Sequence, residues 1–175
     1  FKAMKGSTDI PITIKHRIGV DDQESYEFLS DFVGVIAEAG CKTFIIHARK
    51  ALLKGLSPKE NREIPPLKYE YIFQLKKDFP NLEIILNGGI KDLDQSIDIL
   101  KHLDGVMLGR EAYQNPYLLA EVDHRIYNNA ISPISRSEVL QQFVKIMSGK
   151  LLPGMKISHV TRHILGLYKG IPGGR

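Results

Sequence analysis

The sequence has 175 residues, of which 43% are hydrophobic and 25% are charged, a composition typical of a globular protein and not of a disordered or fibrous one. No apolar stretch approaches the roughly 20 residues of a membrane-spanning helix, and the first five residues lack the apolar core of a signal peptide. The single cysteine, Cys41, cannot form an internal disulfide, and the sequence gives no sign of secretion. Together these features predict a cytoplasmic protein that does not associate with membranes.

The net charge of +4 is unevenly distributed along the chain. Between Arg49 and Arg62 there are five basic residues and one acid, and from Lys145 to Arg175 there are six basic residues, two histidines and no acid. Charge clustered in this way favours a polyanionic partner such as nucleic acid. A solvated basic surface without a partner has the same pattern.

Four apolar runs predict buried strands, and helical periodicity between them predicts helices. The predicted strands cover residues 10–17, 43–48, 83–87 and 105–108, and the predicted helices cover about residues 21–40, 69–77 and 92–102. Strands that alternate with helices at this spacing indicate α/β units and a parallel sheet.

The alternation stops after residue 108. A helical segment is expected over residues 111–127 with a break at Asn115 and Pro116, followed by a linker. Ser135 and Glu138 have the spacing of a capping box that opens a helix to about residue 147, and a last helix is expected over residues 157–169. We therefore predict an α/β domain over residues 1–125 and a small helical domain over residues 126–175.

Polar side chains gather towards the ends of the first two predicted strands. Side chains alternate between faces along a strand, so Lys15 and Arg17 share one face, as do His47 and Arg49. A single cation at a strand end is usually a surface group. Two strands with cations on a common face fit the active-site end of a (β/α)8 barrel as well as they fit a surface, so both interpretations stay open.

Glycine-containing turns follow the third and fourth strands, as Asn87-Gly88-Gly89 and Gly109-Arg110. Glycine lets backbone N–H groups approach an anion closely. Two such turns in consecutive loops match the phosphate site after strands 7 and 8 of a (β/α)8 barrel. The predicted fold is therefore α/β: the C-terminal half of a (β/α)8 TIM barrel, strands 5–8, followed by a small all-helical domain.

The connection over residues 49–66 is long and basic. Connections beyond about 15 residues are usually lids or binding loops, and the alternative is a disordered insertion.

Five motifs together resemble the tRNA dihydrouridine synthase family, and in particular its A subgroup. They are IKHRIG at residues 14–19, IHARK at 46–50, GLSPKENR at 55–62, NGGI at 87–90 and MLGREAY at 107–113. Other flavin barrels share single motifs, but the ordered set is specific. The resemblance covers nearly the whole chain and marks it as the C-terminal portion of such an enzyme.

The resemblance implies an FMN cofactor, NADPH as reductant, and reduction of a uridine to 5,6-dihydrouridine in the D-loop of tRNA. It assigns three groups of residues. Those that contact the flavin ring and ribityl chain are Lys15 and His47; those that hold its phosphate are Asn87, Gly88, Gly89, Gly109 and Arg110; those that meet the substrate are Arg49 at the uracil and Lys59, Arg62, Lys169 and Arg175 on the tRNA.

The sequence departs from the family at the general acid, a cysteine in an earlier loop of the barrel. Cys41 precedes the second strand, at the wrong end of the barrel, and is expected to be a small core residue. We therefore expect that this chain does not catalyse uridine reduction alone. We also expect it to be a monomer and to have no metal site. Two other functions remain open: an FMN-barrel oxidoreductase acting on a small molecule, or a non-catalytic RNA-binding remnant.

Overall fold

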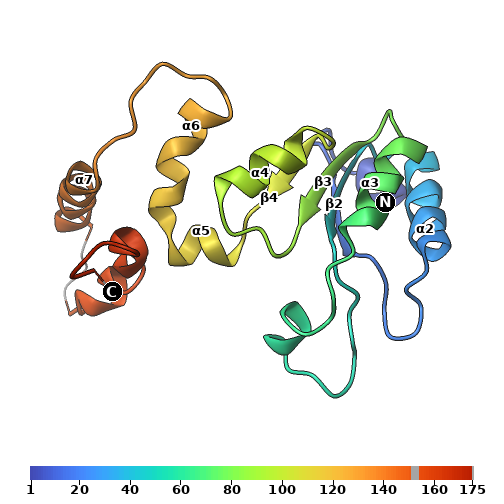
Figure 1. The fold of residues 1–175 in the computed structure, drawn as a ribbon, viewed down its shortest axis with the longest axis horizontal. Helices are drawn as coiled ribbons and strands as arrows, with labels where there is room; N and C mark the ends of the chain where they lie inside the picture. The colour runs from blue at the N-terminus through green and yellow to red at the C-terminus, as the bar shows by residue number, and fades with distance from the viewer. Residues whose placement is uncertain (151–153, 175) are drawn as a thin grey trace. The chain divides into compact units, whose positions relative to one another are not determined.

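A computed structural model describes residues 1–150 and 154–174 of the chain, which form two compact units (Figure 1). The first unit comprises residues 1–90 and 94–108, and the second comprises residues 91–93 and the chain from Gly109 onward. The contacts thus divide the chain after Leu108. The functional division at residue 125 stays a prediction.

The first unit is built on a four-stranded parallel sheet in the order β1-β2-β3-β4. The strands are β1 (Ile14–Arg17), β2 (Thr43–His47), β3 (Glu83–Asn87) and β4 (Gly105–Met107). All four predicted strands are confirmed, but β1 begins at Ile14 and not at residue 10. Pro11 lacks an N–H group and cannot contribute to the hydrogen-bond ladder.

Helices alternate with these strands. They are α1 (Lys2–Lys5), α2 (Tyr26–Glu38), α3 (Tyr69–Asp78) and α4 (Leu93–Leu100), with a 3-10 turn η1 (Glu60–Arg62) in the loop after β2. Helix α2 starts later than the sequence predicted, because Ser25 caps it by accepting a hydrogen bond from the Phe28 N–H at 3.2 Å. Asp21, expected at its start, lies in a preceding turn with φ 48°.

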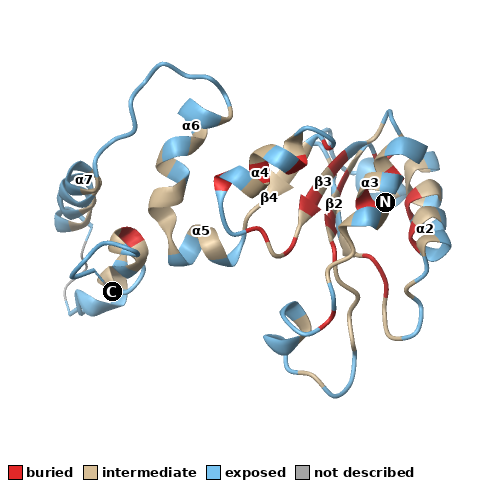
Figure 2. Ribbon diagram, in the orientation of Figure 1, coloured by how far each residue is buried: buried red, intermediate tan, exposed pale blue. Residues whose placement is uncertain are grey.

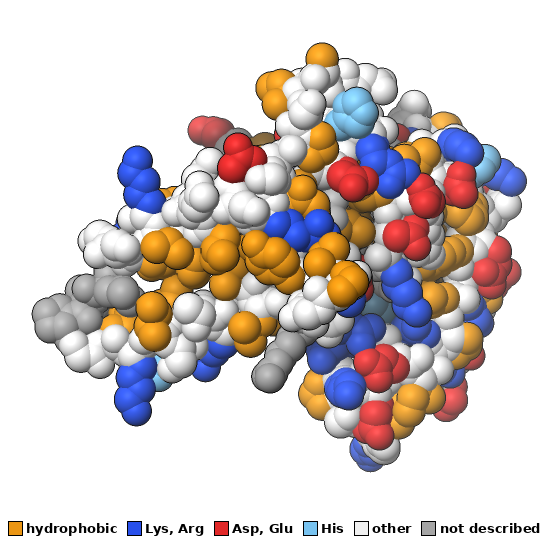
Figure 3. All heavy atoms as spheres, turned by 60° about the vertical axis from the view of Figure 1, so that its left-hand side comes forward, with side chains coloured by type: hydrophobic (Ala, Val, Ile, Leu, Met, Phe, Trp, Pro, Cys, Tyr) orange, Lys and Arg blue, Asp and Glu red, His pale blue; other side chains and the backbone are white. Residues whose placement is uncertain are grey.

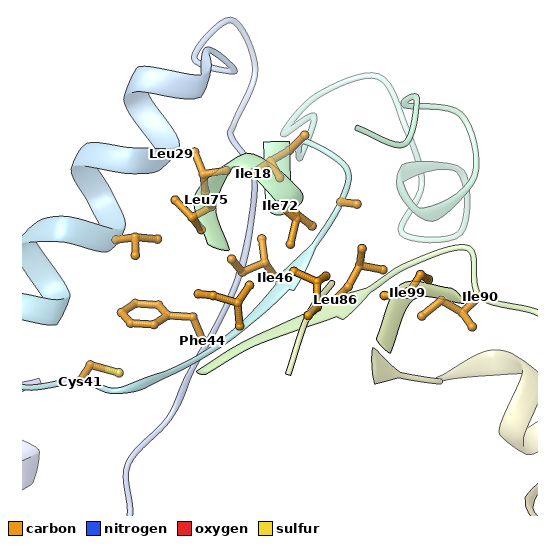
Figure 4. Close-up of a cluster of buried hydrophobic side chains, with 14 residues drawn as sticks. Ile18, Leu29, Cys41, Phe44, Ile46, Ile72, Leu75, Leu86, Ile90 and Ile99 are labelled. Carbon is orange, nitrogen blue, oxygen red and sulfur yellow. The ribbon is translucent and has the colours of Figure 1, made fainter. Parts of the chain in front are cut away.

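In the described part of the first unit, helices pack on one face of the sheet, whereas the side chains of the other face are half-buried or exposed (Figure 2). Phe44, Ile46, Ile84 and Leu86 are fully buried and pack in one cluster with side chains of the helices (Figure 4). The helix residues in this cluster are Leu29 and Val33 of α2, Ile72 and Leu75 of α3, and Ile99 of α4. Burying each such side chain contributes about 1.5–3 kcal/mol, so this face stabilises the unit.

The opposite face carries Lys15, Ile45, His47, Ile85 and Asn87, which are exposed or half-buried. A parallel sheet with helices on one face and a second face of mixed character is consistent with part of a (β/α)8 barrel.

Cys41 belongs to the buried cluster, with 1% of its surface exposed, and its thiol donates to the Thr43 carbonyl at 3.4 Å. The prediction that it is a small core residue is confirmed.

The elements described in the second unit are helical. They are α5 (Arg110–Gln114), the 3-10 segment η2 (Pro116–Glu121), α6 (Val122–Arg125), α7 (Arg136–Ser148), α8 (Ser158–Thr161) and the 3-10 turn η3 (Leu165–Tyr168). The capping box of Ser135 and Glu138 is confirmed at the start of α7.

The continuous helix predicted over residues 157–169 is wrong, because the segment breaks into α8 and η3. Around the break, Gly166 lies so close to the Gln114 carbonyl that a Cβ there would come within 2.3 Å of its oxygen. Tertiary packing therefore overrides the helical periodicity.

An apolar cavity of about 360 Å³ lies within the second unit, lined by residues that include Tyr117, Val139, Phe143 and Leu167. Other apolar side chains of α7, such as Val144 and Ile146, are exposed, and Figure 3 shows hydrophobic side chains at the molecular surface. None of the helices in the described part of the chain combines the length and the apolar character needed to cross a membrane.

Candidate active site

The strand register brings polar residues of three strands together at one edge of the sheet. Arg17 pairs with His47, and His47 pairs with Asn87, at the carboxyl ends of β1, β2 and β3. Lys15 lies two residues before Arg17 on the same, uncovered face. The sequence prediction that Lys15 and His47 share a face is therefore confirmed, while their contacts with a flavin stay predictions.

His47 is a neutral side chain among cations. Burial, together with the positive charges of Arg17, Lys15 and Arg49, lowers its pKa to about 4. Its Nδ1 atom is buried and has no hydrogen-bond partner among the described residues. A buried polar atom without a partner costs free energy, and His16 Nε2 shares this feature.

The turn after β3 requires glycine at both positions. Gly88 has φ +109° and Gly89 has φ +74°, values that other residues rarely adopt. A Cβ on Gly88 would lie 3.0 Å from Nε2 of His47, and one on Gly89 would lie 2.4 Å from Cδ1 of Leu67. The backbone of Gly88 therefore lies against the His47 ring. Glycine allows such a close approach, which a binding site for an anion or a ring system requires.

A tyrosine that the sequence interpretation missed supports this turn. The Tyr69 hydroxyl donates to the Gly88 carbonyl at 2.5 Å and accepts from the Gln95 amide at 3.4 Å. Burial raises the pKa of Tyr69, so it stays a protonated donor. No local sequence signal marks this role, because Tyr69 lies 19 residues from Gly88 at the start of another element.

Asn87 links neighbouring strands. Its side-chain amide donates to the Met107 carbonyl of β4 at 2.7 Å, and its own carbonyl accepts from the Ala48 N–H at 2.9 Å. It pairs with His47 in the strand register, and its predicted contact with the flavin phosphate stays a prediction.

Arg17 is a second residue that the sequence prediction left without a role. Its Nη1 donates to the carbonyls of Lys50 at 2.7 Å and Asn61 at 2.8 Å. Burial and the nearby charges of Arg62 and Arg49 lower its pKa. Its position two residues after Lys15 on the same face was the signal that could have identified it.

Arg49, predicted to face the uracil, donates from Nη1 to the Pro65 carbonyl at the far end of the loop. The loop itself contains η1 and several hydrogen bonds, so the alternative of a disordered insertion does not describe it (Figure 1). Lys59 and Arg62 are exposed on this loop. Their contacts with tRNA stay predictions.

The remaining predicted residues belong to the second unit. Gly109 immediately precedes α5, and Arg110 is its first residue and is exposed. Lys169 forms an ion pair with Glu111 at 2.8 Å, and Arg175 lies outside the described residues. Within the described ranges, no group of three or more His, Cys, Asp or Glu side chains is placed to hold a metal ion.

These features define a class of protein: an α/β chain whose parallel strands end in cations, a neutral histidine and a glycine turn. The family model described as dihydrouridine synthase (Dus) matches residues 1–175, so the chain belongs to the dihydrouridine synthase family.

Curated relatives agree with this family. The chain is 56% identical over 174 residues to a tRNA-dihydrouridine(20/20a) synthase of Pseudomonas putida, covering 99% of this chain and 52% of the relative. It is 55% identical over 174 residues to the enzyme of the same name from Vibrio cholerae, covering 99% of this chain and 53% of that enzyme. It is 53% identical over 175 residues to the Escherichia coli enzyme of that name, covering 99% of this chain and 53% of that enzyme. The chain thus spans about half the length of these relatives.

Proposed function

We propose that this chain forms the flavin-holding part of an enzyme that reduces uridine to 5,6-dihydrouridine in the D-loop of tRNA, using FMN and NADPH. The observation that carries the proposal is the row of Lys15, His47 and Asn87 on one face of adjacent strands, followed by the Gly88-Gly89 turn. In this proposal the sheet supplies strands 5–8 of a (β/α)8 barrel, and residues 126–175 form a small all-helical tRNA-binding domain.

The residues of the first unit fit a flavin. The uncovered face offers Lys15 as a cation, the buried Nδ1 of His47 as a hydrogen-bonding atom, and the close-lying backbone of Gly88 and Gly89. When bound, the flavin supplies the hydride, and a nearby cation stabilises the negative charge of its reduced ring. His47 stays neutral at pH 7, because its pKa is about 4, and therefore hydrogen-bonds without adding a charge.

The phosphate of the flavin is assigned to two glycine turns. We propose that Asn87, Gly88 and Gly89 bind the phosphate, and the resemblance assigns Gly109 and Arg110 to the same group. Backbone N–H groups at such turns and an arginine are the groups that bind phosphate most readily.

The tRNA substrate is assigned to the basic residues. Phosphate contacts by lysine and arginine provide affinity irrespective of base sequence, and we assign this role to Lys59, Arg62, Lys169 and Arg175. The uridine must leave its stack to meet a flavin, and Arg49 is proposed to face it there.

Proton transfer to the uracil is not assigned to this chain. Cys41 is buried and lies six residues before His47, about 20 Å of extended chain from the edge where the polar residues gather. We propose that the acid comes from outside these 175 residues, so that the chain alone does not reduce uridine.

The test uses the full-length gene product and its visible absorption spectrum. Flavin bands at about 375 and 450 nm are expected in the purified protein and should be lost in a Lys15→Ala, Arg110→Ala double variant. Lys101→Ala is a matched control, because Lys101 is an exposed lysine paired with Asp98 after α4. Dihydrouridine formation in tRNA is then measured with NADPH.

Each outcome decides between the alternatives. A folded, colourless protein that cannot be reconstituted with FMN would overturn the flavoenzyme proposal and leave an RNA-binding remnant. A flavin-loaded protein that neither binds nor modifies tRNA would favour an oxidoreductase that acts on a small molecule.

A further inference from the structure

The basic loop, residues 49–66, is fastened to the carboxyl end of the sheet at two points. From β1, Arg17 donates to the carbonyls of Lys50 and Asn61, which lie near the two ends of the loop. Asn61 then closes the loop on itself: its Oδ1 accepts from the Leu52 N–H at 2.8 Å, and its Nδ2 donates to the Leu52 carbonyl at 2.7 Å. Two side chains thus make four hydrogen bonds to the backbone of one loop.

The same loop is joined to the preceding loop between β1 and α2. The Ala51 N–H donates to the Gly19 carbonyl at 2.9 Å, and the Ala51 carbonyl accepts from the Asp21 N–H at 2.7 Å. The Asp21 carboxylate also accepts from the Leu53 N–H at 2.9 Å. These bonds make consecutive loops of the site one connected structure.

Ion pairs add little to this connection. Glu24 lies 3.1 Å from the ammonium of Lys50 and 3.4 Å from that of Lys68, and both contacts are solvent-accessible. Such pairs stabilise a fold weakly. Arg49 also donates to the Pro65 carbonyl, and Asp21 accepts from the Leu53 N–H. The bonds of Arg17 and Asn61 add four contacts to these, and their removal should loosen the loop.

The loop needs fastening because its charges repel one another. Burial lowers the pKa of Arg17, and the nearby charges of Arg62 and Arg49 lower it further. Lys54, Lys59 and Arg62 are all exposed between the fastened ends. Like charges in one short segment favour extended, mobile conformations, and the two carbonyl oxygens that accept from Arg17 oppose this tendency.

We propose that Arg17 and Asn61 are positioning residues that hold the basic loop in one conformation before tRNA binds. The loop is then a fixed platform, not a closing lid, and Lys54, Lys59 and Arg62 meet the phosphate backbone without a separate ordering step. A segment that must be ordered on binding lowers affinity, so a pre-ordered loop strengthens tRNA binding. This inference rests on the proposed function.

The experiment compares Asn61→Ala with wild type in the full-length gene product. Trypsin cleavage after Lys54, Lys59 and Arg62 reports on loop opening, and we expect it to be about tenfold faster in the variant, which lacks both bonds to Leu52. The KM for tRNA should rise by a similar factor, about tenfold, while kcat and flavin content stay unchanged. Arg17→Lys keeps the charge, but its shorter side chain does not place a donor where Nη1 lies, and it should show a smaller change in the same direction.

Asn81→Ala is the matched control, because Asn81 is exposed just before β3, at the opposite end of that strand from Asn87. If Asn61→Ala and Arg17→Lys are cleaved at the wild-type rate, Arg17 and Asn61 do not hold the basic loop in one conformation. Faster cleavage with an unchanged KM for tRNA would overturn the role in substrate binding. Should Asn61→Ala not fold, the Arg17→Lys variant decides between these outcomes. A wild-type protein that forms no dihydrouridine would refute the proposed function, while the cleavage rates would still test the fastening.

Discussion

Replacing Gly88 with alanine tests the link between the glycine turn and His47. Gly88 is buried with φ +109°, and its added Cβ would meet Nε2 of His47 at 3.0 Å and Cδ2 at 3.2 Å. A non-glycine residue at positive φ costs about 1–2 kcal/mol. The contact with the half-buried imidazole adds to this, so we expect the free energy of unfolding to fall by about 2–3 kcal/mol. The shift of the turn should also weaken the Tyr69 hydrogen bond and reduce bound flavin.

Urea unfolding and flavin content of the full-length gene product measure both effects. Gly6→Ala is the control, because Gly6 has φ −71° and its nearest atoms lie 3.6 Å from the added Cβ. That variant should match wild type or gain about 0.4–1 kcal/mol. A Gly88→Ala protein as stable and as flavin-rich as wild type would refute the reasoning. If Gly88→Ala loses stability but keeps its full flavin content, the strain at position 88 is supported and a contact between this turn and the flavin is rejected.

Two further predictions concern charge. The pKa of His47 is lowered from 6.5 to about 4, so acidification protonates the unfolded chain first and stability should fall as the pH drops from about 6.5 towards 4. His47→Gln should remove that part of the loss between pH 7 and pH 5 in urea unfolding; an unchanged pH dependence would show that His47 titrates normally. Lys59→Ala should reduce the slope of log affinity for tRNA against log salt concentration by about 1. Lys101→Ala should not, and equal slopes in all three proteins would exclude a Lys59 phosphate contact.

The sheet and the position of its polar edge could be predicted from sequence because both depend on short-range patterns. Phe44 and Ile46 alternate with polar or half-buried neighbours in β2, and Ile84 and Leu86 do the same in β3. This period of two fixes which face each side chain takes, and it predicts that Lys15 and His47 share a face.

The contacts that organise the site could not be predicted because they join residues far apart in the chain. Arg17 reaches carbonyls 33 and 44 residues away, and backbone acceptors carry no sequence signature. The break between α8 and η3 was missed for a related reason. Its helical periodicity is intact, and the close approach of Gly166 to Gln114 appears only in three dimensions.

The arrangement separates two requirements of the proposed reaction. Arg17, His47 and Asn87 come from adjacent parallel strands, so short β/α units are enough to bring them to one edge of the sheet. Cys41 does not donate a proton at this edge, since it is held in the core before the opposite end of β2. Flavin retention and uridine reduction should therefore respond to different substitutions. Changes at His47 or Gly88 should affect the flavin, whereas Cys41→Ser should leave the flavin spectrum and the pH dependence of turnover unchanged.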